Sequence, residues 1–448
     1  MRADQIKSLA LDCGFELAGI AAAAPVPEAN YYHQWRADGF AGEMRYLTDR
    51  RAALRNDPRS LLPSARSILC VGKLYNGPRP YSTNFTGDDL AWISRYAWGE
   101  DYHDVLRHGL LRLVDRLRAQ SVESFEWKIC VDTAPLLERA YARHAGLGWI
   151  AKNTCLIHQG MGSWFFLGEL LLSLDLEPDQ PPPDRCGTCT RCIDACPTEA
   201  IVPTGLAAGP AWALDSRLCI SYLTIEMRGP VPEALRPALG RHVFGCDICQ
   251  DVCPWNQRAP INSAFNPAHF APPLEMLAAL SSEEFRGLFQ NSPIPRARYA
   301  GFLRNVAIAM GNARQEKFRM PLEKLASSPE PFVAESARWA LPRLEGIAGS
   351  PARPLVTSTP VVDVGEHARL SRPHVYNARC HDRAMLRMTE FQVHAAPDES
   401  RLQHRAAPVG PLDVHQHRLG TELRMPGNQR LPISAIHQRV RAVLRFHA

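Results

Sequence analysis

The sequence predicts an α+β protein with three structured segments, and three observations support this fold class. Short β-like runs and amphipathic helical periodicity are mixed up to the proline-rich stretch at residues 179–184. Eight cysteines then lie between residues 186 and 253, and amphipathic periodicity returns at residues 274–344. We therefore predict four segments, at residues 1–179, 180–262, 263–348 and 349–448.

Within the first segment, the apolar pattern predicts a long helix and two strands. The spacing over residues 101–120 is three and four, so one helical face holds Val105, Leu106, Leu110, Leu111, Val114 and Leu117. The runs "SILCVG" from Ser67 and "FEWKICVD" from Phe125 are short and β-like.

The cysteine-rich segment opens with "CGTCTRCIDACP", which matches the run C-x2-C-x2-C-x3-C-P at every position. In this run three thiolates bind one four-iron cluster, and the cysteine before the proline turns to a second cluster. Zinc is the competing metal, but it favours two pairs of ligands separated by a longer spacer. The spacing therefore predicts iron–sulfur clusters.

A second run, "CDICQDVCP", lacks the first cysteine of that pattern, and Cys219 is the only cysteine between the two runs. In two-cluster ferredoxins the cysteine before each proline binds the other cluster. The same arrangement here predicts one cluster on Cys186, Cys189, Cys192 and Cys253. The other cluster is predicted on Cys196, Cys219, Cys246 and Cys249. Five isolated cysteines are expected in the core or at the surface: Cys13, Cys70, Cys130, Cys155 and Cys380.

The last two segments differ in character. "GFLRNVAIAMGNA" and "PFVAESARWALPRLE" predict amphipathic helices stacked as in HEAT-type repeats. Residues 351–448 hold fourteen arginines, no lysine and nine of the sixteen histidines. This composition predicts a poorly ordered tail without function, a nucleic-acid-binding extension being the alternative. The bias toward arginine and histidine without lysine would also result from translation of a GC-rich gene outside its original reading frame.

The whole composition is that of a globular chain, with 448 residues of which 46% are hydrophobic. The N-terminus lacks the order of a signal peptide, and no uncharged run reaches the roughly 18 residues that span a bilayer. We expect a monomeric cytoplasmic protein without membrane contact, whose thirteen cysteines are reduced and bind metal. The net charge of +5 permits a polyanionic partner without requiring one.

Several stretches around the two cysteine runs resemble one family. They include "YAWGEDYH", "CVDTAPLLERAYARHAGLGWIAKNTCLI", "GSWFFLGELL", "CISYLTIEMRG" and "GCDICQDVCPWN". Together they are similar to the epoxyqueuosine reductases over about residues 1–344. The resemblance implies a cobalamin-binding, nitroreductase-like first domain, a bacterial-ferredoxin-like domain with two 4Fe-4S clusters, and a HEAT-like helical domain.

The implied reaction is the last step of queuosine synthesis, at the wobble position of tRNAs for Asp, Asn, His and Tyr. The implied partners are the tRNA anticodon stem-loop and an external electron donor. Two alternatives remain. One is a cobalamin-dependent reductive dehalogenase, and the other is a ferredoxin-type electron-transfer protein.

Asp132 is the candidate catalytic acid on the family pattern. Burial beside a cofactor would favour its neutral form, as a proton donor requires. The alternative is structural, because "DTAPLLERAYA" is typical of a helix with Asp132 as its N-cap and Pro135 in the first turn. Tyr102 and His103 are candidates for contact with the substrate or its proton relay, although a histidine at a helix start is commonly just solvated.

The resemblance also implies contacts to base-off cobalamin, many of them from the loop "GWIAKNT". The candidates are Arg55, Leu137, Lys152, Asn153, Thr154, Leu156, Ser163, Leu167, Ser221 and Asp247. For tRNA phosphates the candidates are Arg139, Arg143, Arg228, Arg241, Arg296, Arg298 and Arg304. Each of these residues alone is more typical of a turn or a solvated helix face.

Overall fold

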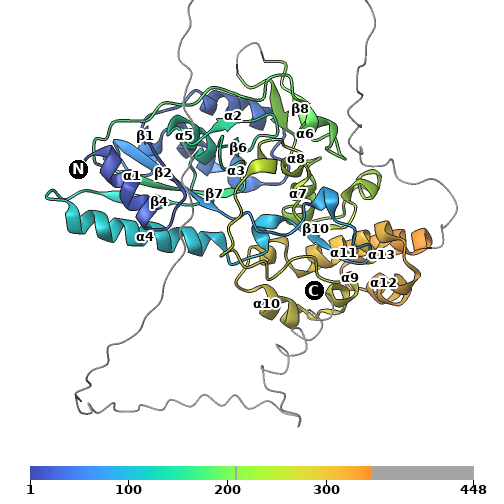
Figure 1. Ribbon diagram of the computed structural model, residues 1–448. Coiled ribbons are helices and arrows are strands. Elements are labelled where there is room, and N and C mark those ends of the chain that lie inside the picture. Colours follow the sequence, from blue (N-terminus) through green and yellow to red (C-terminus); the bar gives the residue numbers. More distant parts are fainter. Residues whose placement is uncertain (207–208, 345–448) are drawn as a thin grey trace, which may run out of the picture. The chain divides into compact units, whose positions relative to one another are not determined.

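A four-stranded antiparallel sheet lies at the centre of the first segment in the computed structural model, which describes residues 1–206 and 209–344. The strand order is β1 (Leu17–Ala22), β2 (Ser67–Leu74), β7 (Phe165–Leu172) and β4 (Trp127–Cys130). Both predicted strands are confirmed, as β2 and β4. Figure 1 shows the sheet among the blue and cyan elements.

Helices cover both faces of this sheet, which explains the unbroken apolar run Ile68–Val71 in β2. Helices α1 (Ala3–Asp12) and α4 (Tyr102–Gln120) pack on the face that carries Leu69 and Val71. Helix α5 (Glu138–His144) packs on the opposite face, which carries Ile68 and Cys70. Successive strand residues point to opposite faces, so a strand covered on both faces favours apolar residues in succession.

Two close contacts complete this layer. The predicted helix at 101–120 is confirmed as α4, with Leu106, Leu110 and Val114 buried. Gly19 allows α5 to approach β1, since a Cβ at this position would lie 2.0 Å from the carbonyl oxygen of Ala145. The remaining elements of the segment are α2 (Glu28–Ala37), α3 (Arg45–Thr48), β3 (Trp92–Ile93), β5 (Trp149–Ile150) and β6 (Leu156–Ile157).

The cysteine-rich segment consists of short elements. These are α6 (Arg191–Asp194), β8 (Ile201–Pro203), β9 (Trp212–Leu214), α7 (Ile220–Ile225), β10 (His242–Phe244) and α8 (Ile248–Asp251). Strands β8 and β9 form an antiparallel pair, whereas β10 pairs in parallel with β3 of the first segment. Pairing between β3 and β10 therefore joins two segments that the sequence separates.

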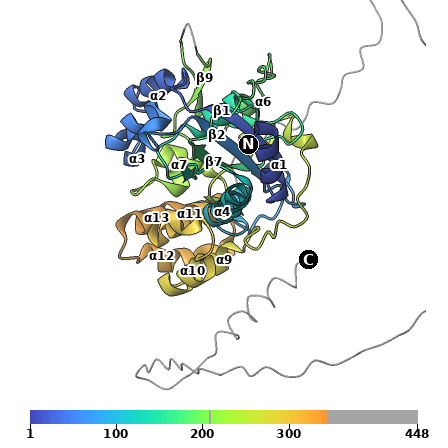
Figure 2. The ribbon, with the colours of Figure 1, turned by 90° about the vertical axis from the view of Figure 1, so that its left-hand side faces the viewer.

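Five α-helices lie within residues 274–344, and the two quoted stretches are confirmed as the helices α11 and α13: α9 (Leu274–Ala279), α10 (Ser282–Phe289), α11 (Tyr299–Ala313), α12 (Arg319–Ala326) and α13 (Pro331–Leu344). Figure 2 shows them as one group. Their largest apolar cluster includes Trp92, Ile93 and Trp98, which come from the first segment. The expected HEAT-like stacking stays a prediction.

The amphipathic interpretation of α11 is wrong, because every residue from Gly301 to Gly311 is buried. The helix is enclosed by α7, β10, α9, α12 and α13, so it has no solvated face. Arg304 and Asn305 are tolerated inside because backbone carbonyl groups accept their hydrogen bonds.

No helix within residues 1–206 or 209–344 has the length and apolar character needed to cross a membrane. The predicted tail at 349–448, with Cys380, lies outside the described residues.

Candidate active site and cluster-binding segment

Asp132 follows strand β4 and adopts a left-handed backbone conformation, with φ of 47°. Helix α5 begins only at Glu138, with Leu137 as its N-cap, so the interpretation of Asp132 as a helix cap is wrong. Pro135 supplies the reason, because a proline disfavours helical geometry in the residue before it. Residues 132–137 thus form a loop that presents Asp132 beside the sheet.

His103 connects Asp132 to a second carboxylate. Its Nε2 lies 3.1 Å from Oδ2 of Asp132, and its Nδ1 lies 2.7 Å from Oδ1 of Asp101, the N-cap of α4. Hydrogen bonds to Asp101 and Asp132 raise the pKa of His103 to about 9, although burial opposes the shift. His103 is therefore protonated at neutral pH and donates from both ring nitrogens.

The pKa of Asp132 is lowered, whereas the sequence predicts that burial favours its neutral form. Burial raises it, but the hydrogen bond and charge of His103, with contributions from Arg296 and Tyr102, bring it below the ordinary value. The expectation that burial keeps Asp132 neutral is wrong here, because a cation lies within hydrogen-bond distance. Asp132 and His103 hold one proton between them, and it resides mainly on the imidazole.

Tyr102 forms the wall of this site. Burial, and then the charge of Asp132, raise the pKa of its hydroxyl far above the ordinary value, so the hydroxyl stays protonated. Its ring stacks on His103, with centroids 4.2 Å apart, and on Phe166, with centroids 4.8 Å apart. The structure thus brings the predicted acid and both predicted substrate residues together.

The loop "GWIAKNT" lies between this site and the cysteine-rich segment. The ammonium group of Lys152 donates to the carbonyl oxygens of Gly187, at 2.8 Å, and Cys189, at 2.9 Å. The amide of Asn153 donates to the carbonyl oxygen of Cys249 at 3.2 Å. Both side chains therefore hold the cysteine loops. Thr154 adopts φ of 63°, and its carbonyl oxygen accepts a hydrogen bond from Arg139.

The other predicted cofactor residues separate into two groups. Leu137, Leu156 and Leu167 belong to one apolar cluster. Of these three side chains, Leu156 is buried and the other two are partly exposed. The polar candidates are engaged within the protein. Asp247 accepts from Ser94 Oγ at 2.5 Å, the Arg95 amide at 2.8 Å and the Trp92 indole at 3.2 Å.

Arg55 and the two serines have these surroundings. Arg55 is 5% exposed and donates to the carbonyl oxygens of Tyr46 and Arg51. Ser163 is buried, and its hydroxyl lies 2.9 Å from Oε1 of Gln250. Ser221 is partly exposed on α7, two residues after Cys219.

Cys192 and Cys246 each lie near other cysteines of their predicted groups, while the full assignment of the eight thiols stays a prediction. Burial and then the charges of Cys253, Cys186 and Cys189 raise the pKa of Cys192 to about 12. In the other group, the pKa of Cys246 is raised mainly by burial and then by the charge of Cys219. Cys196 raises it by a smaller amount. Helices α6 and α8, which carry one cysteine run each, pack against each other.

The thiols of the two runs suit four-iron clusters, because a four-iron cube takes one thiolate at each iron and eight thiols supply two cubes. Within the described ranges, no three His, Cys, Asp or Glu side chains gather closely enough for one metal ion. The sulfur of Cys196 also accepts the Ala200 amide at 3.3 Å, the kind of hydrogen bond that sets cluster potentials.

Of the five cysteines expected in the core or at the surface, four lie within the described residues: Cys70 and Cys130 are buried in the core, and Cys13 and Cys155 are partly exposed. Cys155 lies close enough to Cys249 to raise the pKa of that thiol.

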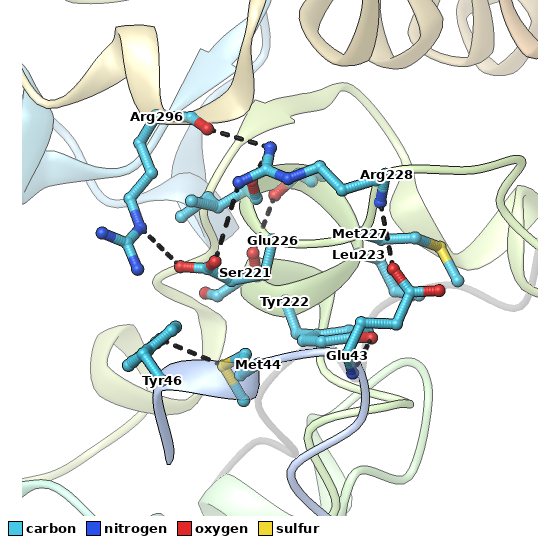
Figure 3. A network of polar contacts seen from close by, with 12 residues as sticks. Glu43, Met44, Tyr46, Ser221, Tyr222, Leu223, Glu226, Met227, Arg228 and Arg296 are labelled. Atoms are coloured by element: carbon cyan, nitrogen blue, oxygen red, sulfur yellow. Dashed lines mark hydrogen bonds and ion pairs between the residues drawn. The ribbon is translucent and has the colours of Figure 1, made fainter. Parts of the chain in front are cut away.

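An arginine-rich cavity of about 840 Å³ lies in this region and is lined by Gly42, Glu43, Met44, Arg45, Tyr46, Arg51, Glu226, Arg228 and Arg298. Figure 3 shows the network at its wall. Glu226 accepts from Arg296 at 2.6 Å, and Arg228 donates to the carbonyl oxygen of Arg296 at 3.0 Å. Burial, and then the charge of Glu226, raise the pKa of Tyr46 to about 12, with a smaller effect of Asp132.

The predicted tRNA arginines separate by exposure. Arg298 is exposed and Arg228 is partly exposed at the cavity, whereas Arg304 is 0% exposed. The prediction that Arg304 contacts tRNA is wrong, because its guanidinium is used by the carbonyl oxygens of residues 223–229. Arg143 pairs with Glu28, and Arg241 donates to two backbone carbonyl groups.

Sequence reasoning missed two acidic residues behind Asp132. Glu138 accepts the backbone N–H of Asp132 at 2.5 Å, and Glu169 is 0% exposed on β7. A signal for Glu169 was present, because it is the one charged residue in the strand "FFLGELLL".

Comparison with known proteins gives the same family from several directions. A family model described as "Epoxyqueuosine reductase QueG, DUF1730" matches residues 55–133, and one described as "4Fe-4S double cluster binding domain" matches residues 185–256. The epoxyqueuosine reductase of Xanthomonas campestris is 40% identical over 348 residues, which cover 76% of this chain and 95% of that protein. The Escherichia coli enzyme is 36% identical over 345 residues, covering 76% and 88%.

Solved structures agree. A crystal structure of epoxyqueuosine reductase with an epoxyqueuosine-modified tRNA-Tyr stem loop has a TM-score of 0.68 and 29% identity, covering 76% of this chain and 89% of that chain. The Bacillus subtilis enzyme, solved with an aspartate-bearing catalytic loop swung out of the active site, has a TM-score of 0.67 and 29% identity, covering 76% and 90%. This chain belongs to the epoxyqueuosine reductase family.

Proposed function

We propose that this protein reduces epoxyqueuosine to queuosine at the wobble position of the tRNAs for Asp, Asn, His and Tyr. The observation that carries this proposal is the hydrogen-bonded pair of Asp132 and His103 in a chain of this family that also matches a double 4Fe-4S cluster-binding domain at residues 185–256. The family membership argues against the dehalogenase and ferredoxin alternatives, since the two relatives of 40% and 36% identity are epoxyqueuosine reductases.

The reaction removes the epoxide oxygen as water and leaves an alkene, which consumes two electrons and two protons. Protonated His103 and Asp132 lie 3.1 Å apart, so a proton can pass from the imidazole to the carboxylate and from there to the oxygen as a carbon–oxygen bond breaks. Asp101 holds the ring orientation through Nδ1, and the protonated hydroxyl of Tyr102 lies near the Asp132 carboxylate. The electrons come from an external donor.

The electron path would run through two 4Fe-4S clusters bound by the two thiol groups. Cobalamin, when bound, supplies a strongly reducing cobalt centre for the substrate. The apolar cluster of Leu137, Leu156 and Leu167 would support its ring, because two of these side chains stay partly exposed at the surface of the core. The left-handed turn at Thr154 and the hydroxyl of Ser221 would face its amide groups.

The arginine-rich cavity would receive the RNA backbone next to the modified nucleotide. Arg45 and Arg298 are exposed there and can neutralise phosphates, while the paired Glu226 keeps Arg296 in place. Extrusion of the modified base toward Asp132 would add specificity.

The test is an anaerobic preparation reconstituted with iron, sulfide and cobalamin and supplied with excess reductant and epoxyqueuosine-containing tRNA. We expect queuosine in the digested tRNA, measured by mass spectrometry. A fully loaded protein that leaves epoxyqueuosine unchanged contradicts the proposal.

A further inference from the structure

Two carboxyl groups lie behind Asp132 and are not used in the proton delivery described above. Glu169 is on strand β7, where it lies opposite Cys70 of β2 and Cys130 of β4. Both cysteines belong to the apolar cluster under α5, so the side chain of Glu169 points to the same face. Glu138 is the first residue of α5. A charged carboxylate at a fully buried position is costly unless it is paired.

The two carboxyl groups can only be stable next to each other with a proton between them. Neither side-chain oxygen of Glu169 has a donor from another side chain or the backbone in the described part of the chain, and its polar neighbour is the Glu138 carboxyl. Two carboxylates have no hydrogen to share and repel, whereas one proton turns the contact into a hydrogen bond.

The direction of this hydrogen bond follows from the surroundings. Burial, and then the charge of Glu138, raise the pKa of Glu169 well above its ordinary value. Burial and the charge of Asp132 raise the pKa of Glu138 to about 7, while the contact with Glu169 lowers it. Glu169 is therefore the proton holder, and Glu138 is the acceptor.

Glu138 is also the residue that binds the backbone of Asp132. Its Oε1 accepts the Asp132 N–H at 2.5 Å. Asp132 has φ of 47°, a conformation that costs energy in any residue except glycine and persists only where neighbours hold it. A carboxylate that accepts from both Glu169 and Asp132 would hold this backbone firmly.

We propose that Glu169 and Glu138 form a proton-sharing pair that positions Asp132, with the Glu169 hydroxyl donating to Glu138 and Glu138 accepting the Asp132 N–H. Both are positioning residues, since neither is argued to touch the substrate. The inference rests on the proposed function for the role of Asp132, but the pair itself is a property of the folded protein.

Matched substitutions at each position test the positioning role. Glu169→Gln keeps an N–H that can donate to Glu138, and Glu169→Leu removes the donor at similar volume. We expect Glu169→Gln to keep kcat within about threefold and Glu169→Leu to lower it about 10- to 100-fold at unchanged KM for tRNA. Glu138→Gln keeps an acceptor for the Asp132 N–H, so its kcat should be higher than that of Glu138→Leu.

Stability separates positioning from a general structural role. Removing one partner of a buried pair leaves the other carboxylate without its donor, so Glu169→Leu should unfold at a lower denaturant concentration than the wild type. The double variant Glu169→Leu/Glu138→Leu removes both carboxyl groups and should recover stability, whereas its kcat should stay low because the Asp132 N–H has lost its acceptor. Wild-type kcat in Glu169→Leu overturns the positioning role, and so does a kcat that recovers together with stability in the double variant.

Infrared spectroscopy tests the shared proton without substrate. In mildly alkaline buffer, where Glu138 is ionised, we expect a carbonyl band of a protonated carboxylic acid that shifts in D₂O. The band should persist in Asp132→Asn and disappear in Glu169→Gln. A band that survives in Glu169→Gln overturns the pair. Since this measurement needs no turnover, it decides the question even if epoxyqueuosine is not the substrate.

Discussion

The imidazole Nε2 of His103 lies 3.1 Å from Oδ2 of Asp132, although 29 positions separate the two residues in the chain. His103 belongs to the first turn of α4, and Asp132 lies in the loop after β4. A second contact, from Nδ1 to Asp101, fixes the ring. This arrangement makes His103 and Asp132 one proton-holding unit, and its consequences can be measured.

Asp132→Asn should abolish proton delivery and leave the fold intact. Asn tolerates left-handed backbone geometry better than most residues, and position 132 caps no helix, so we expect a stability change within about 1 kcal/mol. Turnover of epoxyqueuosine should fall at least about a hundredfold, because Asn cannot deliver a proton. Single-turnover assays with matched iron and cobalamin content provide the measurement. Near-normal rates would move the search for the donor to Tyr102 and His103.

His103→Gln should change the pH dependence of the reaction. In the wild type the imidazole stays protonated up to its pKa of about 9, so activity should decline as the pH rises through this value. The variant should lose this alkaline limb and turn over more slowly at neutral pH. The pH profile of kcat is the measurement, and an unchanged alkaline limb would exclude His103 as its origin.

The same pKa predicts a pH-dependent stability. Because the folded pKa of His103 is raised above the ordinary value of about 6.5, its stabilisation is complete below that pH and is lost as the pH rises toward about 9. The free energy of unfolding of the wild type should therefore decrease over this window relative to His103→Gln. Parallel denaturant titrations of both proteins at several pH values test the difference.

Cys219→Ser should damage one cluster selectively. The wild type should bind about eight irons after anaerobic reconstitution, in two four-iron clusters. Cys219 is expected to complete the group of Cys196, Cys246 and Cys249, so the variant should lose up to about half of the iron and one set of electron paramagnetic resonance signals. Cys13→Ser is a matched control outside both groups. Unchanged iron content and spectra would show that another ligand completes this cluster.

Arg298→Ala and Arg304→Leu should have opposite consequences. Arg298 is exposed at the arginine-rich cavity, so its loss should weaken tRNA binding and reduce the salt dependence of the affinity, with little effect on stability. Arg304 is fully buried and bonds to three carbonyl groups, so Arg304→Leu should cost about 2–4 kcal/mol of stability. Fluorescence anisotropy with a stem-loop RNA and chemical denaturation separate the two effects. Equal loss of affinity without loss of stability in both variants would contradict this assignment.

The sequence by itself determined the features that depend on local spacing. A cluster-binding run needs its thiols within one short loop, so the positions of Cys186, Cys189 and Cys192 are sufficient to predict it. The helix at 101–120 follows from the periodicity of its own apolar residues, which is why α4 was predicted within one residue of its observed start. The family resemblance pointed to Asp132 in the same way, through a contiguous motif.

Only the tertiary structure decided which side chains meet. Arg304 looked like a surface cation, but α11 is enclosed on all sides and its guanidinium serves the backbone. Asp132 looked like a helix cap, but the helix begins at Glu138, and Glu138 itself reaches back to the Asp132 backbone. Burial and charge act through space, so a pKa such as that of His103 depends on partners far away in the chain. For that reason no local pattern could predict the proton-holding unit or the carboxyl pair behind it.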